Sequence, residues 1–354
     1  MEGSSVPHSL ESMVELLKIA HEMNASDLHI SVGSPPVLRI NGSLKPLESE
    51  SLNSEETAKM AESLLSREQA ERFENAGEID FSYELEGLSR YRINAYRQRG
   101  RVSIAIRTIP TKIPTLEQLQ LPSIVSTLAL KPQGLVLVTG PTGSGKSSTL
   151  AAMIDFINKT QKHHIVTLED PIEYLHTHNK SIIDQREVGN DTKSFSNGLR
   201  AALRQDPDVI LVGEMRDLET ISAAVTAAET GHLVFATLHT TDAAQTIDRI
   251  IDAFPGHQQG QIRVQLASVL AGVISQRLFP KPKGLGRSCA TEILINTPAV
   301  ANLIRSEKIH QIKSVMQTSR ALGMHTLEMT IRDQLQQGLI EPSAAKAYLT
   351  EGGM

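Results

Sequence analysis

One eight-residue segment constrains the fold of this chain more than any other, and it reads Gly140-Pro141-Thr142-Gly143-Ser144-Gly145-Lys146-Ser147. Its spacing is that of a phosphate-binding loop, in which glycines let the backbone wrap so that its amides point inward. A predicted strand at 135–138 precedes it directly and a predicted helix at 148–157 follows. The helix presents the positive end of its dipole to the phosphate that the loop would bind. A glycine-rich loop that arose by chance would not need to lie between a strand and a helix.

The loop predicts a nucleoside triphosphate site with ATP and Mg²⁺ as ligands. Lys146 is expected to neutralise the β- and γ-phosphates, and Ser147 is expected to ligate Mg²⁺. The predicted nucleotide-binding residues of this segment are Gly140, Pro141, Thr142, Gly143, Ser144, Gly145, Lys146, Ser147 and Ser148.

The C-terminal two thirds predict an α/β fold. Short apolar runs at 135–138, 165–168, 209–212 and 233–236 alternate with helical stretches, as in a parallel sheet covered on both faces. The apolar stretch around 264–274 predicts a buried helix, since it is too short to span a bilayer, and the tail from about Leu278 is predicted to be largely helical.

The N-terminal third predicts a smaller α+β domain. Helical spacing at 9–21 and 54–73 surrounds a hairpin turn at Asn41-Gly42, and strand-like alternation follows at 79–85, 88–96 and 102–109. A chain of 354 residues is long enough for two domains. Pro110 and Pro114 bracket a linker, so the predicted boundaries are 1–110, 111–115 and 116–354.

Carboxylates stand where an open α/β sheet places its ligands. Glu214 follows the buried strand at 209–212 with Gly213 between, and it is predicted to be a catalytic Mg²⁺ ligand, directly or through water. Glu169, Asp170 and Glu173 follow another core strand. ATP hydrolysis needs one carboxylate to orient the attacking water and another to bind the metal ion, and we predict that Glu173 orients the water. Glu169 and Asp170 could equally be solvated turn residues.

Two histidines lie at the two ends of one apolar strand, His232 at its start and His239 at its end. Their separation is too long for a local metal pair. They could be packing or capping residues, or they could sense the γ-phosphate at the carboxyl edge of the sheet.

Arginines are concentrated at 90–101, where alternation places Arg90 and Arg92 on one strand face. A solvated edge and a nucleic-acid surface are two interpretations, the second weakened by an aromatic content of only 3%. We favour a third interpretation, in which arginines of one subunit contact the ATP bound to a neighbouring subunit. Arg92 is a candidate for this role, and on weaker grounds so are Arg107, Arg249 and Arg263.

Net charge and cysteine content limit which cellular compartments and binding partners are expected for this chain. A net charge of −5 offers no global attraction for nucleic acid or an anionic membrane. With Cys289 as its one cysteine, the chain has no internal disulfide and no cysteine zinc cluster. Residues 1–10 lack a cationic start and an apolar core, so no secretory signal is expected.

Taken together, these motifs resemble the secretion and type IV pilus ATPases, and among them the retraction motors. The resemblance spans most of the chain and rests on segments 25–29, 140–147, 169–173, 213–217 and 231–241. It implies a RecA-like motor domain behind a PAS-like N-terminal domain. It also assigns the catalytic glutamate to Glu173, the Walker B glutamate to Glu214, and nucleotide-sensing histidines to His232 and His239.

The same resemblance implies a homohexamer in the cytoplasm, docked on a platform protein at the inner face of the inner membrane, with no nucleic acid. The segment 297–305 resembles a signature of the retraction motors, which usually has Ile-Arg where Val300-Ala301 stand here. The four-cysteine zinc site of many assembly ATPases is missing from the sequence, which favours retraction over extension.

The expected function is therefore ATP-driven retraction of a type IV pilus, as in twitching motility. The alternatives are a nucleic-acid translocase, which DNA would stimulate, an accessory or assembly ATPase of the same family, and a small-molecule kinase. A small-molecule kinase is the least favoured of these alternatives, because no arginine-rich lid segment follows the helix after the phosphate-binding loop.

Overall fold

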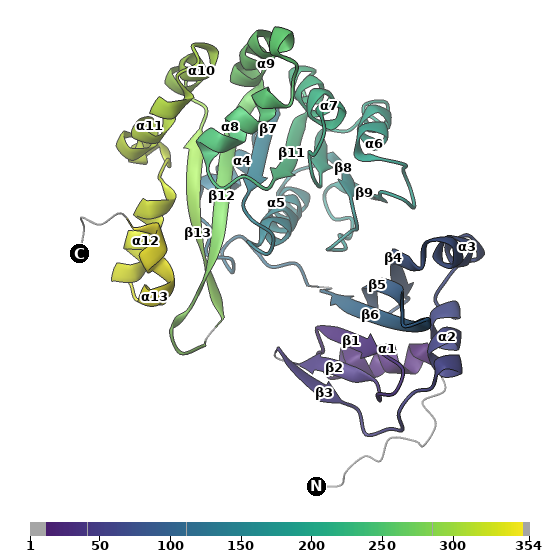
Figure 1. The fold of residues 1–354 in the computed structure, drawn as a ribbon. Coiled ribbons are helices and arrows are strands. Elements are labelled where there is room, and N and C mark those ends of the chain that lie inside the picture. Colours follow the sequence, from purple (N-terminus) through teal and green to yellow (C-terminus); the bar gives the residue numbers. More distant parts are fainter. Residues whose placement is uncertain (1–11, 41, 111, 285, 350–354) are drawn as a thin grey trace. The chain divides into compact units, whose positions relative to one another are not determined.

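The structure is a computed structural model that describes residues 12–349 except 41, 111 and 285. Residues 1–10, Asn41 of the predicted hairpin turn and Thr111 of the predicted linker lie outside the described residues. The chain divides into two compact units, unit 1 at Met1–Lys112 and unit 2 at Ile113–Met354, each with its own hydrophobic core (Figure 1).

Unit 1 is an antiparallel sheet with helices on one face (Figure 1). Its six strands have the order β3-β2-β1-β6-β5-β4. The strands are β1 (Asp27–Ile30), β2 (Val37–Ile40), β3 (Ser43–Pro46), β4 (Glu78–Leu85), β5 (Ser89–Gln98) and β6 (Arg101–Ile109). The helices are α1 (Met13–Glu22), α2 (Ser54–Glu62) and α3 (Arg67–Ala76).

Local sequence sets the ends of these helices. Asn53 and Ser66 form capping boxes at the starts of α2 and α3, so orphan amides of both first turns are bonded. The alternating residues of β5 point inward, and Tyr91 among them donates its hydroxyl to the Leu17 carbonyl of α1 at 3.1 Å. Burial raises the pKa of Tyr91 to about 12, so its hydroxyl keeps the proton that it donates.

Unit 2 contains a seven-stranded sheet with the order β13-β12-β7-β11-β10-β8-β9. All neighbours pair in parallel except β12 with β13. The strands are β7 (Gly134–Thr139), β8 (His164–Glu169), β9 (Ile182–Glu187), β10 (Val209–Val212), β11 (Leu233–Leu238), β12 (Leu270–Pro280) and β13 (Arg287–Ile295).

Helices cover both faces of this sheet (Figure 1). The longer ones are α5 (Lys146–Thr160), α6 (Phe195–Ala202), α7 (Leu218–Glu229), α8 (Ala243–Asp252), α9 (Gly256–Val269), α10 (Pro298–Arg305) and α12 (Leu327–Gln336). Shorter ones are α4 (Ile124–Ala129), α11 (Ile312–Thr318) and α13 (Pro342–Ala345).

Alternate side chains of β7 point to opposite faces of the sheet, which explains why two hydrophobic cores lie on its two sides. Leu135 and Leu137 pack into one core with α6 to α11, whereas Val136 and Val138 pack into another with α4 and α5. Both sets are fully buried, so the strand is apolar throughout, as the sequence predicts for a parallel sheet with two covered faces. The predicted α/β fold with a parallel sheet is confirmed.

The predictions for the region after α9 are partly wrong. The apolar stretch 264–274 is not one buried helix, because α9 ends at Val269 and β12 begins at Leu270. The tail from Leu278 is not largely helical at first, since it completes β12 and then forms β13. The sequence pattern of a short apolar run does not distinguish a helix from a buried strand. Here the edge of β7 that does not pair with β11 needs a strand partner, and β12 pairs with it.

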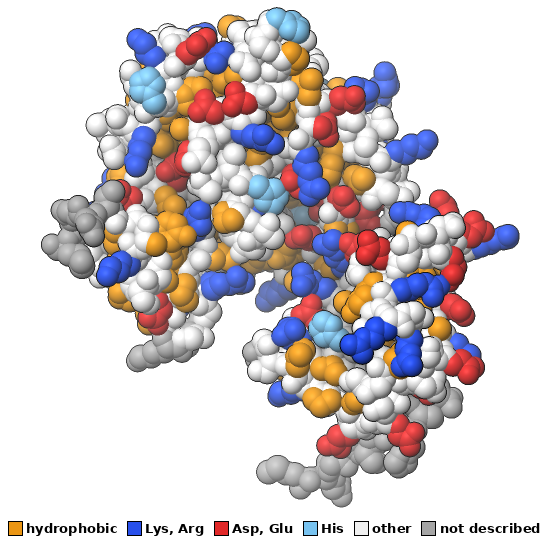
Figure 2. Space-filling view, in the orientation of Figure 1, with side chains coloured by type: hydrophobic (Ala, Val, Ile, Leu, Met, Phe, Trp, Pro, Cys, Tyr) orange, Lys and Arg blue, Asp and Glu red, His pale blue; other side chains and the backbone are white. Residues whose placement is uncertain are grey.

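Charges of both signs are interspersed over the face drawn in Figure 2, without one continuous field of either sign. The net charge of −5 agrees with this mixed surface. Among the described residues, no helix combines the length and apolar character that a membrane crossing needs.

Candidate nucleotide site

The loop at Gly140–Gly145 connects the carboxyl end of β7 to α5. Gly140, Gly143 and Gly145 have φ values of 143°, 77° and 90°, which residues with a Cβ rarely adopt. The N-cap of α5 is Gly145, and no side chain caps this helix. Its first amides therefore have no side-chain capping oxygen and are available to an anion, which is the arrangement that phosphate binding requires.

Lys146 lies against this loop. Its Nζ donates to the carbonyl oxygens of Gly140 at 2.8 Å and Pro141 at 3.2 Å. Burial lowers the pKa of the Lys146 ammonium, and the negative charges of Glu214 and Glu173 oppose that shift. The three predicted catalytic residues thus share one electrostatic environment at the end of β7.

Strand register explains why these groups meet. β11 pairs in parallel with β7 so that Leu238 is opposite Thr139, and β10 pairs in parallel with β11. The residues that follow these strands, among them His239 and Glu214, therefore lie at the same carboxyl edge as the loop.

Glu214 is held between the side chains of Arg216 and His239. Its Oε2 is 2.7 Å from Arg216 Nη2, and its Oε1 is 3.2 Å from His239 Nε2. Burial by itself would raise the pKa of Glu214, but the hydrogen bonds and charges of Arg216 and His239 lower it overall. The carboxylate is consequently ionised at neutral pH and suited to a metal ion or to its water.

Glu173 lies on the loop after β8 and is exposed. Two side chains of β9 hold this loop: Gln185 donates from Nε2 to the Tyr174 carbonyl at 2.8 Å, and Glu187 Oε2 accepts from the Ile172 amide at 3.0 Å. The loop is thus fixed while the Glu173 side chain remains accessible, which suits a group that orients water.

Glu169 is distinguished from Glu173 by burial. Its Oε1 accepts from Thr167 Oγ1 at 2.7 Å and from Gln185 Nε2 at 3.1 Å. Burial raises the pKa of Glu169, and these donors only partly offset that effect. This acid is partly buried and bonded within the framework of the loop, whereas Glu173 is exposed.

Ser148 connects the helix after the phosphate loop to the acidic segment. Its hydroxyl is 2.8 Å from the hydroxyl of Tyr174, the residue next to Glu173. The structure therefore gives Ser148 a protein partner, and its predicted contact with nucleotide stays a prediction.

His176, at the end of the same loop, is a partly buried histidine. Its backbone amide donates to Gln185 Oε1 at 2.8 Å, and within the described residues its Nδ1 is buried without a hydrogen-bond partner. Burial lowers the pKa of His176 to about 4, against which the charge of Asp155 acts weakly.

This burial predicts an acid-sensitive stability. As the pH falls from 6.5 towards 4, the unfolded chain protonates this histidine and the folded chain does not, so the free energy of unfolding decreases by up to about 1.4 kcal/mol per pH unit. A His176→Phe variant should lose that component, which denaturant titrations at pH 7, 6 and 5 would measure. Other shifted groups, such as His325, act equally in both proteins, so identical pH slopes would contradict the prediction.

His232 is not brought to the loop of its own chain. The Gly134 amide donates to the His232 carbonyl at 3.0 Å, which places His232 at the amino edge of the sheet. Six residues of β11, at about 3.3 Å each, separate it from His239. Its Nδ1 lies 2.9 Å from the Ala227 carbonyl, so the packing and capping interpretation describes it well.

Arg92 and Arg107 lie on the sheet of unit 1. Arg92 Nη2 is 2.5 Å from Asp80 Oδ2, and Arg107 Nε is 3.1 Å from Asp27 Oδ1. Both arginines line a hollow of about 380 Å³ that also contains His29. They form a charged surface on one face of unit 1, and their role toward a neighbouring subunit stays a prediction.

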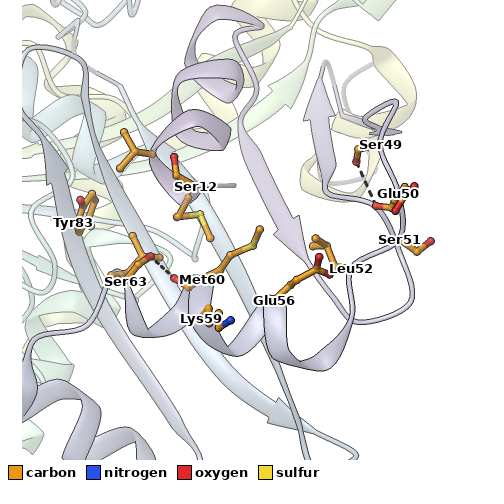
Figure 3. Close-up of a pocket in the computed structure, with 13 residues that line it drawn as sticks. Ser12, Ser49, Glu50, Ser51, Leu52, Glu56, Lys59, Met60, Ser63 and Tyr83 are labelled. Atoms are coloured by element: carbon orange, nitrogen blue, oxygen red, sulfur yellow. Dashed lines mark hydrogen bonds between the residues drawn. The ribbon is translucent and has the colours of Figure 1, made fainter. Parts of the chain in front are cut away.

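A larger cavity of about 610 Å³ occupies another part of unit 1 (Figure 3). The start of α1, the segment at 49–52 and α2 surround it, with Met60 and Tyr83 among its lining side chains (Figure 3). It contains none of the predicted site residues.

Several residues around the site were not predicted. Arg216 could have been found, because it follows Glu214 by two residues in the quoted segment 213–217. Gln185 and Gln276 had no local signal, because each reaches the site from a strand whose place in the sheet was not predicted.

The fold and the site together define a class: this chain is a RecA-like P-loop nucleoside triphosphatase. A family model described as "Type II/IV secretion system protein" matches residues 11–334. The chain belongs to this family.

Relatives and solved structures support the same placement. The chain is 48% identical over 341 residues to the type IV pilus retraction ATPase PilT of Pseudomonas aeruginosa. The aligned region covers 96% of this chain and 99% of that protein. The chain is 50% identical over 311 residues to a twitching motility protein of Neisseria gonorrhoeae, covering 88% of this chain and 83% of that protein. A crystal structure of the pilus retraction motor PilT with bound ADP superimposes with a TM-score of 0.90 and 50% identity, covering 96% and 97% of the two chains.

Proposed function

We propose that this chain hydrolyses ATP as a hexameric motor and that the energy drives retraction of a type IV pilus. One observation carries the proposal: over 96% of its length the chain shares its fold and half of its residues with a pilus retraction motor that binds ADP. The local geometry agrees, because the phosphate loop, Lys146 and two carboxylates converge at one edge of the sheet.

The residues present fit a nucleotide. The uncapped start of α5 and the positive φ values of Gly143 and Gly145 supply a backbone cradle for phosphate oxygens. Pro141, Thr142 and Ser144 complete the loop. Lys146 would move from the Gly140 and Pro141 carbonyls to the β- and γ-phosphates, which are better partners for an ammonium group.

The residues present also fit Mg²⁺ held together with a nucleotide. Hydroxyl and carboxylate oxygens from Ser147 and Glu214 are ligands that Mg²⁺ prefers, and phosphates and water would complete its shell. In the part of the chain that the structure describes, no group of three or more His, Cys, Asp or Glu side chains gathers as a metal site. When bound, Mg²⁺ would neutralise charge on the phosphates.

The chain's own groups then have separate tasks. Glu173, exposed on a braced loop, orients the attacking water. Lys146 stabilises negative charge that develops on the transferred phosphoryl group. Glu214 keeps its charge because Arg216 and His239 lower its pKa, and His239 connects this carboxylate to the end of β11.

The remaining predicted residues belong to contacts between subunits in this proposal. In a homohexamer with head-to-tail interfaces, Arg92 and Arg107 of one subunit would reach the ATP of the next, where an arginine is worth about 10³ to 10⁵ in rate. His232 lies at the amino edge of the sheet, so any nucleotide-sensing role is also indirect or between subunits.

We place the motor in the cytoplasm, at the inner face of the inner membrane, where a pilus platform protein would hold it. Support comes from the named relatives, which are pilus motors and a twitching motility protein. Nucleic acid is not a proposed partner.

Pilus dynamics in living cells test this function. In the source bacterium, deletion of the gene should leave extended pili that do not retract, and the wild-type gene should restore retraction events seen by fluorescence microscopy of labelled pili. Normal retraction in the deletion strain would contradict the proposal. Strong stimulation of purified ATPase by DNA would instead support a translocase.

A further inference from the structure

The P-loop rests on a residue that its own motif does not contain. β12 pairs in parallel with β7, and the last pair joins Ser275 to Thr139. The next residues along the two strands are Gln276 and Gly140, so Gln276 lies directly beside the start of the loop. Its side chain is 2% exposed, and its Nε2 donates to the Ser144 carbonyl at 2.7 Å.

Both ends of the loop are packed against this one residue. A Cβ on Gly140 would lie 2.4 Å from the Gln276 carbonyl oxygen, and a Cβ on Gly145 would lie 3.1 Å from Gln276 Nε2. Real Cβ atoms do not approach a backbone oxygen so closely. Gly140 is therefore required by the close approach of β12 as well as by its φ of 143°.

The hydrogen bond to Ser144 fixes a peptide plane. The Ser144 carbonyl and the Gly145 amide belong to the same peptide, and in a trans peptide these groups point in opposite directions. Since the carbonyl points to Gln276, the Gly145 N–H points away from it, into the loop. Without the Gln276 amide, that peptide could rotate and present its carbonyl oxygen where phosphate oxygens bind.

We propose that Gln276 is a positioning residue for nucleotide binding, which holds the Ser144–Gly145 peptide in the orientation that presents its N–H to phosphate. The inference rests on the proposed function, because it deepens the assignment of the loop as an ATP site. It predicts an effect on affinity rather than on the chemical step, since Lys146, Glu173 and Glu214 are untouched.

The same unit contains a matched control. Gln334 on α12 is another glutamine whose Nε2 donates to a strand carbonyl, that of Cys289, at 2.8 Å. Within the described residues, the Oε1 atoms of both glutamines are buried without hydrogen-bond partners. A Gln334→Leu variant therefore removes a bond of the same kind away from the loop, from a glutamine that is partly buried.

The test compares Gln276→Leu, Gln276→Glu and Gln334→Leu with wild type. We expect Gln276→Leu to raise both the Kd for ATP and KM about tenfold, because the Ser144–Gly145 peptide would then occupy the binding-competent orientation only about a tenth of the time, with kcat within threefold of wild type. Gln276→Glu keeps the shape but sets an acceptor against the Ser144 carbonyl, so it should weaken binding at least as much. Gln334→Leu should keep the wild-type Kd and KM.

Thermal unfolding without nucleotide separates positioning from folding. Folded protein in both leucine variants, combined with weaker ATP binding in the Gln276 variants alone, would support the inference. Wild-type KM and Kd in the Gln276 variants, or a lower kcat at unchanged KM, would overturn it. If wild-type protein itself fails to bind ATP, the proposed function fails instead, which distinguishes the two.

Discussion

Replacement of Lys146 by alanine should lower kcat for ATP hydrolysis by at least about 10² to 10³, the usual cost of removing a group that stabilises transition-state charge. Lys146 is half-buried beside the Gly140 and Pro141 carbonyls, and no other lysine lies in the loop or the first turn of α5. Release of inorganic phosphate by purified protein measures the effect.

Lys159 provides the control for this experiment, because it lies on the same helix but pairs with Asp155 at the surface. Lys159→Ala should keep kcat within about twofold of wild type, because the Lys159 side chain is 54% exposed and lies in the last turn of α5, away from the loop. Equal losses in the two variants would indicate general damage to α5 and contradict the specific role of Lys146.

Replacement of Glu173 by glutamine should lower kcat by about 10² to 10³ while ATP binding is retained. The amide keeps the shape of the side chain but cannot accept a proton from the attacking water. The bracing of the loop by Gln185 and Glu187 does not involve the Glu173 side chain, so the loop should keep its position. Single-turnover hydrolysis together with an ATP-binding titration measures both parts.

Glu219 on α7 is a suitable control, since it is exposed and only 3.5 Å from Arg200 in a surface ion pair. Glu219→Gln should hydrolyse ATP at the wild-type rate. A Glu173→Gln variant with normal turnover would refute the water-orienting assignment and shift attention to Glu214.

Much of the fold could be predicted because its signals are local. The continuous apolar runs of β7, β8, β10 and β11 each stand alone as buried strands, and the phosphate loop establishes the direction of the first. The strands β9, β12 and β13 were not predicted. β9 reads Ile-Ile-Asp-Gln-Arg-Glu, which is mostly polar because it is an edge strand.

β12 shows a different difficulty. Its first residues continue the apolar pattern of α9 without a break, and only the need to cover the open side of β7 makes Leu270 the start of a strand. That requirement is tertiary and has no local sequence signal.

The candidate site divides in the same way. Its motif residues, from the phosphate loop to Glu214 and His239, could be predicted because each follows a recognisable strand, and the structure brings those groups to one edge. The supporting residues Gln185 and Gln276 reach the site across the sheet from neighbouring strands, so sequence spacing carries no information about them. The structure also separates His232 from His239, which the motif alone groups together.

The central claim is that the backbone amides at the start of α5, together with Lys146, bind the phosphates of ATP. Titration calorimetry of the intact protein with ATP and Mg²⁺ tests it most directly. We expect one site per chain with a Kd below about 100 μM, equivalent to more than about 5 kcal/mol of binding free energy, and little heat for Lys146→Ala. Failure of the wild-type protein to bind ATP at millimolar concentration would contradict the account.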